Sequence, residues 1–201
     1  MSELLTFMQL GFRHIVDIEA MDHILFLVAL AAIYRFRDAR NVLWVVTAFT
    51  VGHSISLALA VTGVVNFPAA VIEFLIPVTI VATGIENLLV RDRERAGWRG
   101  RVRPVFAGVF GLVHGAGFAG YLKALFVEHL AVPLFGFNVG IELGQVVVLL
   151  AIAIVIALVD RVLLLVRAGT PARQALRLRV VGISSLVVAV GTVWAVERRP
   201  W

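Results

Sequence analysis

Six long runs of apolar residues follow one another along the chain, separated by short polar segments. A helix needs roughly 20 mostly apolar residues to cross the hydrocarbon core of a bilayer. The pattern therefore predicts about six transmembrane helices, at roughly 21–36, 41–65, 68–90, 104–127, 131–159 and 179–196. Residues 2–19 predict a shorter N-terminal helix, which could lie at the membrane interface. We expect an all-α, polytopic membrane protein with a single transmembrane helical domain over residues 1–201.

The composition supports a membrane protein and excludes several kinds of chemistry. Of the 201 residues, 61% are hydrophobic, whereas soluble domains are about 45–50% apolar. The chain has no cysteine, which excludes disulfides, thiolate metal sites and thiol catalysis. The net charge is +5, and all but one of the 18 basic residues are arginine. These arginines lie in short links between apolar runs, so they predict contacts with anionic lipid headgroups and no nucleic-acid partner.

The distribution of arginine predicts an orientation. The links after the first, third and fifth runs are rich in arginine, whereas the two links between them are nearly free of positive charge. Short loops rich in basic residues stay on the cytoplasmic side of a membrane. We therefore expect the arginine-rich links to be cytoplasmic and both termini to lie outside.

Three titratable residues fall near the middle of predicted spans. They are His53, His114 and Glu142, at similar depth in the second, fourth and fifth runs. Such residues are costly in the hydrocarbon region and are therefore functional candidates. Two imidazoles and a carboxylate suit a divalent transition metal ion. The alternative for His114, which lies beside the pair Gly111 and Gly115, is a hydrogen bond that bridges two helices.

The fifth run has two distinct faces. Asn138, Glu142 and Gln145 are spaced i, i+4 and i+7 and share one face of a helix. This polar face predicts ligands or groups that orient them. Glycines repeat every four residues about 200° away and predict close helix packing; they are Gly136, Gly140 and Gly144.

Further polar residues lie on either side of this central layer. Toward the predicted outside are His14, Asp22, His23 and Glu73, and toward the cytoplasm is Glu86. Asp22 also suits the first turn of a helix, and Glu86 could pair with a neighbouring arginine. Together with the central residues, these groups predict a polar pathway across the membrane. We expect His14, Asp22 and His23 to be metal ligands in addition to the three central residues, and Glu73 and Glu86 to belong to the pathway.

Several of these motifs are similar to those of a known family. The chain resembles the HupE/UreJ membrane proteins, in particular their second subgroup, in DHILFLVAL (22–30), FTVGHSISLALA (49–60), IEFLIPVTIVATGIENLL (72–89), FGLVHGAGFAGYL (110–122) and FGFNVGIELGQ (135–145). The resemblance implies a bacterial inner-membrane protein linked to nickel or a similar metal, because better-known members are nickel permeases or accessory proteins of hydrogenase and urease. The family's motif residues correspond to His14, Asp22, His23, His53, Glu73, Glu86, His114, Asn138 and Glu142.

One spacing departs from the family pattern. The family has five residues between a histidine and an Asp-His pair, whereas seven residues separate His14 from Asp22 here. On a continuous helix, His14 and His23 would then point in nearly opposite directions. Either the helix is broken near 19–21, or His14 does not share a site with His23. Glu19 lies four residues before His23, and these two residues could form the pair in place of His14 and His23.

We therefore expect a protein that transports or binds a divalent transition metal ion, with nickel favoured and zinc or copper also suited to imidazole ligands. Its expected partners are the lipid bilayer and the metal ion, and a homo-oligomer is left open. A second hypothesis is an intramembrane metal-dependent hydrolase, in which Ser54 or Glu86 assists. A third is a non-metal scaffold whose polar residues hold helices together.

Overall fold

The computed structural model describes residues 2–18, 21–35, 38–89, 99–125, 130–166 and 171–201. These residues form seven α-helices and no strand. The all-α prediction is therefore confirmed, and each predicted run coincides with one helix beyond the N-terminal one. The helices are α1 (Glu3–Val16), α2 (Met21–Ala31), α3 (Ala39–Val61), α4 (Ala69–Leu89), α5 (Arg99–Leu125), α6 (Ala131–Val166) and α7 (Ala172–Glu197).

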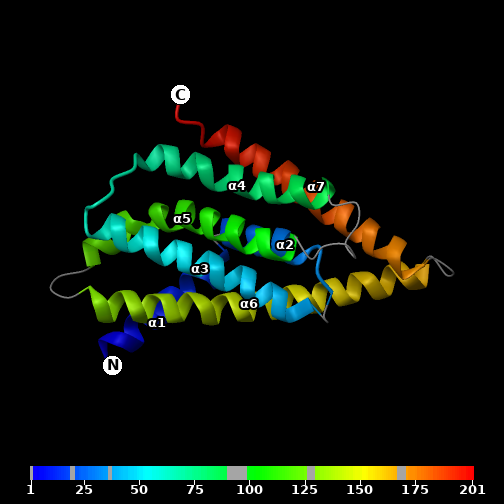
Figure 1. Ribbon diagram of the computed structural model, residues 1–201, viewed down its shortest axis with the longest axis horizontal. Coiled ribbons are helices and arrows are strands. Elements are labelled where there is room, and N and C mark those ends of the chain that lie inside the picture. Colours follow the sequence, from blue (N-terminus) through cyan, green and yellow to red (C-terminus); the bar gives the residue numbers. More distant parts are fainter. Residues whose placement is uncertain (1, 19–20, 36–37, 90–98, 126–129, 167–170) are drawn as a thin grey trace.

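Several helices have the length and hydropathy of membrane spans. Four of the described segments qualify, Ala39–Val61, Ala69–Leu89, Ala131–Leu165 and Gln174–Glu197, and the apolar segments Met21–Ala31 and Val102–Phe118 are shorter. The helices lie side by side along the long axis of the molecule (Figure 1). The chain is thus a multi-pass membrane protein, and its apolar outer surface fits a lipid bilayer.

The N-terminal helix packs lengthwise against α6. A β-carbon on Gly136 would meet the backbone of Leu4, and one on Gly144 would meet the backbone of Phe12. The contacts advance in the same direction along both helices, so α1 runs parallel to the first part of α6. The glycine face of α6 therefore permits close packing, as predicted. Its partner is α1, for which the sequence predicted no contact.

Helices α1 and α2 form one broken pass through the bundle. α1 begins beside the start of α6, whereas α2 ends beside the end of α4, where the Asn87 side-chain amide donates to the Ala29 carbonyl at 2.7 Å. α1 ends at Val16 and α2 begins at Met21. The interruption lies well inside the bundle, so the ends of two half-helices meet the other helices there.

The glycine pair beside His114 also lies at a close helix contact. β-Carbons on Gly111 and Gly115 would collide with backbone atoms of Phe49 and His53 in α3. Helices α3 and α5 therefore run parallel in close contact, and His53 lies beside the helical turn that carries His114. α4 and α7 form a third, antiparallel pair.

Buried arginines connect the helices at the arginine-rich end. Arg103 of α5 donates from Nε to both carboxylate oxygens of Glu86 at 3.0 and 3.1 Å. Arg179 of α7 pairs with Asp160 of α6 and donates to the Tyr34 carbonyl at 2.8 Å. Both termini lie at the opposite end of the bundle (Figure 1). Because both arginines are buried, this end is held by ion pairs as well as by apolar packing.

Candidate metal centre

Four histidines from four helices converge at the break between α1 and α2. They are His14 of α1, His23 of α2, His53 of α3 and His114 of α5. The ring centroids of His14 and His23 are 4.6 Å apart, and those of His23 and His114 are 5.4 Å apart. One candidate ligand atom each from His14, His23 and His53 lies within 4.8 Å of the others.

The break explains how His14 joins this group in spite of its spacing. Two alternatives followed from the nine-residue separation between His14 and His23, and the structure shows the broken helix. The backbone leaves the α-helical conformation at Asp17, which has an extended φ of −65° and ψ of 128°. The two imidazoles therefore come from different helices and face each other. Glu19, the alternative partner of His23, lies outside the described residues.

Asp22 determines how His23 presents its ring. Oδ1 of Asp22 lies 3.1 Å from Nδ1 of His23 and also accepts a hydrogen bond from the His23 backbone N–H at 2.9 Å. A carboxylate accepts only, so Nδ1 carries the proton of the neutral ring. In this tautomer the unprotonated Nε2 carries a free electron pair. Carboxylates orient metal-binding histidines in the same way. Asp22, predicted as a ligand, thus contacts His23 and acts through it.

Thr79 has the same effect on His114. Its hydroxyl lies 2.7 Å from the Ile76 carbonyl and 3.1 Å from Nε2 of His114. A hydroxyl has one proton, and the carbonyl can only accept it. The Thr79 oxygen therefore accepts a hydrogen bond from Nε2–H, and Nδ1 of His114 is left unprotonated. Thr79 was not identified from the sequence, because a threonine inside an apolar helix has no distinguishing pattern.

The free ring nitrogens are buried and have no hydrogen-bond partner among the described residues. These atoms are Nε2 of His14, Nε2 of His23, both ring nitrogens of His53, and Nδ1 of His114. Buried polar atoms are nearly always paired, and an unpaired one costs about 1–3 kcal/mol. Five such atoms on four neighbouring rings are expected where a ligand binds, and a purely structural hydrogen-bond network would have satisfied them.

Aromatic side chains enclose the cluster. The Phe118 ring lies 4.0 Å from that of His14, and the Phe49 and Phe26 rings lie 5.2 and 5.4 Å from that of His114. These rings give the imidazoles largely apolar surroundings. A low-dielectric environment strengthens each interaction between a cation and the imidazole dipoles.

The donor set fits a borderline transition metal. Neutral imidazole binds nickel, zinc, copper and cobalt, whereas magnesium and calcium prefer oxygen. Metal–nitrogen bonds of about 2.0–2.1 Å place two ligands of one ion no more than about 4 Å apart. The three nitrogens that lie within 4.8 Å of one another would therefore move together by on the order of 1 Å. A small shift of α1 relative to α2 would supply that movement.

The predicted carboxylate ligand does not join the cluster. Glu142 is exposed, whereas Gln145 is almost fully buried and accepts a hydrogen bond from the Thr50 hydroxyl at 2.8 Å. Asn138 is half-buried, and its Oδ1 has no partner among the described residues. At about 100° per residue, Glu142 and Gln145 are some 60° apart, and the edge of the buried face of α6 falls between them.

The remaining predicted residues lie away from the cluster or have other partners. Glu73 is exposed near the start of α4. Glu86 pairs with Arg103 at 2.9 Å; the neighbouring Arg91 lies outside the described residues. The Ser54 hydroxyl donates to the Thr50 carbonyl at 2.7 Å. The two groups expected to assist hydrolysis are therefore engaged elsewhere, and the candidate ligands are all imidazoles.

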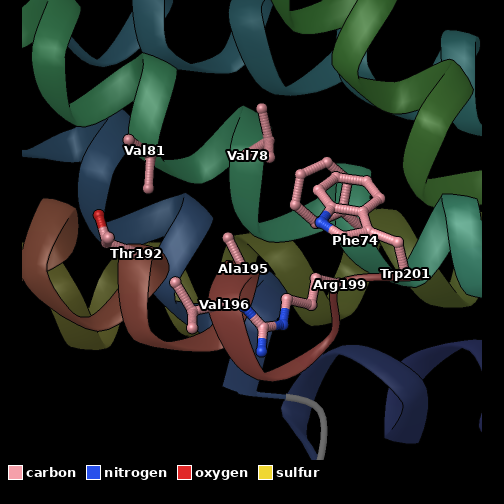
Figure 2. Close-up of a pocket in the computed structure, with 8 residues that line it drawn as sticks. All are labelled: Phe74, Val78, Val81, Thr192, Ala195, Val196, Arg199 and Trp201. Atoms are coloured by element: carbon pink, nitrogen blue, oxygen red, sulfur yellow. The ribbon is translucent and has the colours of Figure 1, made fainter.

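A surface groove of about 350 Å³ lies apart from the histidines. It runs between α4 and α7, and Figure 2 shows apolar side chains along it with Arg199 and Trp201 near one end. None of the residues that line it belongs to the histidine cluster. Its apolar lining suits lipid contact, and we assign it no part in metal binding.

Taken with its apolar helices, this buried imidazole cluster defines a multi-pass membrane protein with a candidate transition-metal site. A family profile described as HupE / UreJ protein matches residues 1–198. The chain therefore belongs to the HupE/UreJ family, which is linked to metal transport. No curated protein and no solved structure matched the chain.

Proposed function

We propose that this protein binds a divalent transition metal ion within the membrane and transports it, with nickel as the favoured ion. The observation that supports this most strongly is the convergence of four histidines whose buried ring nitrogens lack partners. Family membership points to the same class of substrate. His14, His23, His53 and His114 would supply the ligands, while Asp22 and Thr79 hold two of the rings in their binding tautomers.

The broken pass explains why the site lies where it does. The C-terminal end of α1 carries partial negative charge and attracts a cation, and Asp22 in the first turn of α2 offsets the partial positive charge of that helix's N-terminus. Many secondary transporters use interrupted helices in the same way, with the substrate near the bilayer midplane. Since both half-helices carry a ligand, movement of either would change the coordination of the ion. This coupling of binding to helix position is what alternating access requires.

The test is metal analysis of purified, detergent-solubilised protein. Chelator-washed wild type, His53→Asn and His114→Asn are loaded with nickel, zinc, copper or cobalt, and bound metal is counted per chain. We expect near-stoichiometric metal in the wild type and a loss of at least tenfold in affinity in both variants. Glu142→Gln is the control, because Glu142 is exposed, and it should bind as the wild type does.

Two results would contradict the proposal. One is an absence of metal in folded wild-type protein under every loading condition. The other is loss of metal in Glu142→Gln with retention in His53→Asn, which would move the site to the outer face of α6. If the ion is confirmed, uptake into proteoliposomes distinguishes transport from storage.

The scaffold hypothesis has one supporting observation. The contact between His114 and Thr79 joins α5 to α4 at 3.1 Å, as a bridge between helices would. A scaffold predicts that His114→Asn lowers the melting temperature and that metal leaves the wild-type melting temperature unchanged. A metal site predicts a rise in wild-type melting temperature on loading.

A further inference from the structure

Arg198 lies beside the histidine cluster, directly after the last residue of α7. Its Nη1 is 3.5 Å from Oδ2 of Asp22, and Oδ1 of the same carboxylate holds His23. The side chains of Arg198 and Asp22 are 36% and 17% exposed, whereas His53 and His114 are almost fully buried. The arginine and the carboxylate therefore lie between the buried rings and the surface. We call this pair the C-terminal latch.

The latch is an ion pair that can open at little cost. A separation of 3.5 Å is long for a hydrogen bond, and partly exposed ion pairs contribute little to stability because water screens them. The Arg198 guanidinium also lies over the Trp194 ring, 5.4 Å from its centroid. A cation can rest on an indole face. Arg198 thus has a second contact on its own helix when it leaves Asp22.

The charges of the latch oppose those of the substrate. A divalent cation at the histidines would be attracted by the Asp22 carboxylate and repelled by the Arg198 guanidinium. Because the surroundings are apolar, both interactions are stronger than in water. Metal binding and the closed latch therefore disfavour each other.

We propose that Arg198 opposes metal binding electrostatically. In the metal-free protein it pairs with Asp22, and it moves away from Asp22 when a divalent cation binds. This inference rests on the proposed function. It also gives a basis for selectivity by charge. An ion of charge +2 gains twice the attraction to the carboxylate that a monovalent ion gains, so it compensates better for the loss of the arginine.

The neighbouring residue provides a matched control. Arg199 carries the same charge one position later, but it lines the groove between α4 and α7 (Figure 2). Removing its charge changes the net charge of the chain equally. A difference between Arg198→Gln and Arg199→Gln therefore reports the contact with Asp22 and not a general change in surface potential.

The experiment measures nickel affinity by competition with a chromophoric chelator, using the full chain in detergent. We expect Arg198→Gln to bind nickel about threefold to fivefold more tightly than wild type at low ionic strength, because the variant has no ion pair to open before the metal binds. Arg199→Gln should stay within about twofold of wild type, and Arg198→Lys, which keeps the charge, should stay near it. High salt should reduce the difference.

Three outcomes would contradict the proposed role of Arg198. Equal affinities in Arg198→Gln and Arg199→Gln would show that the contact does not oppose the metal. Weaker binding in Arg198→Gln, with an unchanged melting temperature, would show that the arginine supports the site by holding Asp22. A wild type that binds no nickel would remove both the proposed function and this role of Arg198, whereas the first two outcomes leave the proposed function intact.

Discussion

Replacing Thr79 with valine tests whether the His114 tautomer is needed for metal binding. Thr79 lies within α4, and its hydroxyl joins the Ile76 carbonyl to Nε2 of His114. Valine keeps the shape of threonine and removes the hydroxyl. His114 would then lose the acceptor for its Nε2 proton. Its ring could take the other tautomer, in which Nδ1 carries the proton and cannot bind an ion.

The structure sets the size of this effect. The lost acceptor leaves a buried donor unpaired, which costs about 1–3 kcal/mol. Partners that orient metal-binding histidines are typically worth 10–100-fold in affinity. We therefore expect Thr79→Val to weaken nickel binding about 10–100-fold and to lower the free energy of unfolding by about 1–3 kcal/mol. Competition titration gives the affinity, and ¹⁵N chemical shifts of labelled histidine report the tautomer directly.

Thr83 provides the comparison. It lies one turn further along α4, is also buried, and donates its hydroxyl to the Thr79 carbonyl at 2.9 Å. Thr83→Val therefore removes a buried hydroxyl from the same helix without touching a histidine. If both variants lose the same affinity, the effect comes from helix distortion. If Thr79→Val binds nickel as tightly as wild type, the tautomer argument is refuted.

Three other predictions concern packing, the arginine-rich end and pH. Gly140→Ala would place a β-carbon against the Met8 carbonyl oxygen and should cost about 1–3 kcal/mol; an unchanged thermal melt would argue against the α1–α6 contact. Asn87→Ala removes a buried partner of Arg103 and should destabilise the protein by a similar amount in the same assay. Nickel occupancy should fall as the pH is lowered, because protons compete for imidazole nitrogens; occupancy that stays constant down to the pH at which the protein unfolds would contradict histidine ligation.

The sequence determined the helices because local periodicity and length are sufficient for them. Apolar runs of about 20 residues can satisfy their backbone hydrogen bonds in lipid only as helices. The predicted 68–90 and 41–65 became Ala69–Leu89 and Ala39–Val61. The glycine repeats also indicated close contacts correctly. They did not indicate the partner, since any helix without bulky side chains at the contact could fill that role.

Only the tertiary structure decided which polar residues meet. Spacing places Glu142 and Gln145 on one general face of α6. The packing of α1 and α3 against that helix buries Gln145 and leaves Glu142 exposed. Angles along a helix are local, whereas the edge of its buried sector depends on its neighbours. Glu142 was therefore expected beside His53 and His114, whereas the structure leaves its side chain exposed.

The same distinction applies to His14 and Thr79. The long spacing before Asp22 showed that a continuous helix could not bring His14 to His23, and it left open whether the chain breaks. The break exists because separate neighbours hold the two halves, with α1 against α6 and the end of α2 against α4. Thr79 reaches His114 from a position 35 residues away in the chain. Contacts of that kind are set by how helices assemble, and no local pattern encodes them.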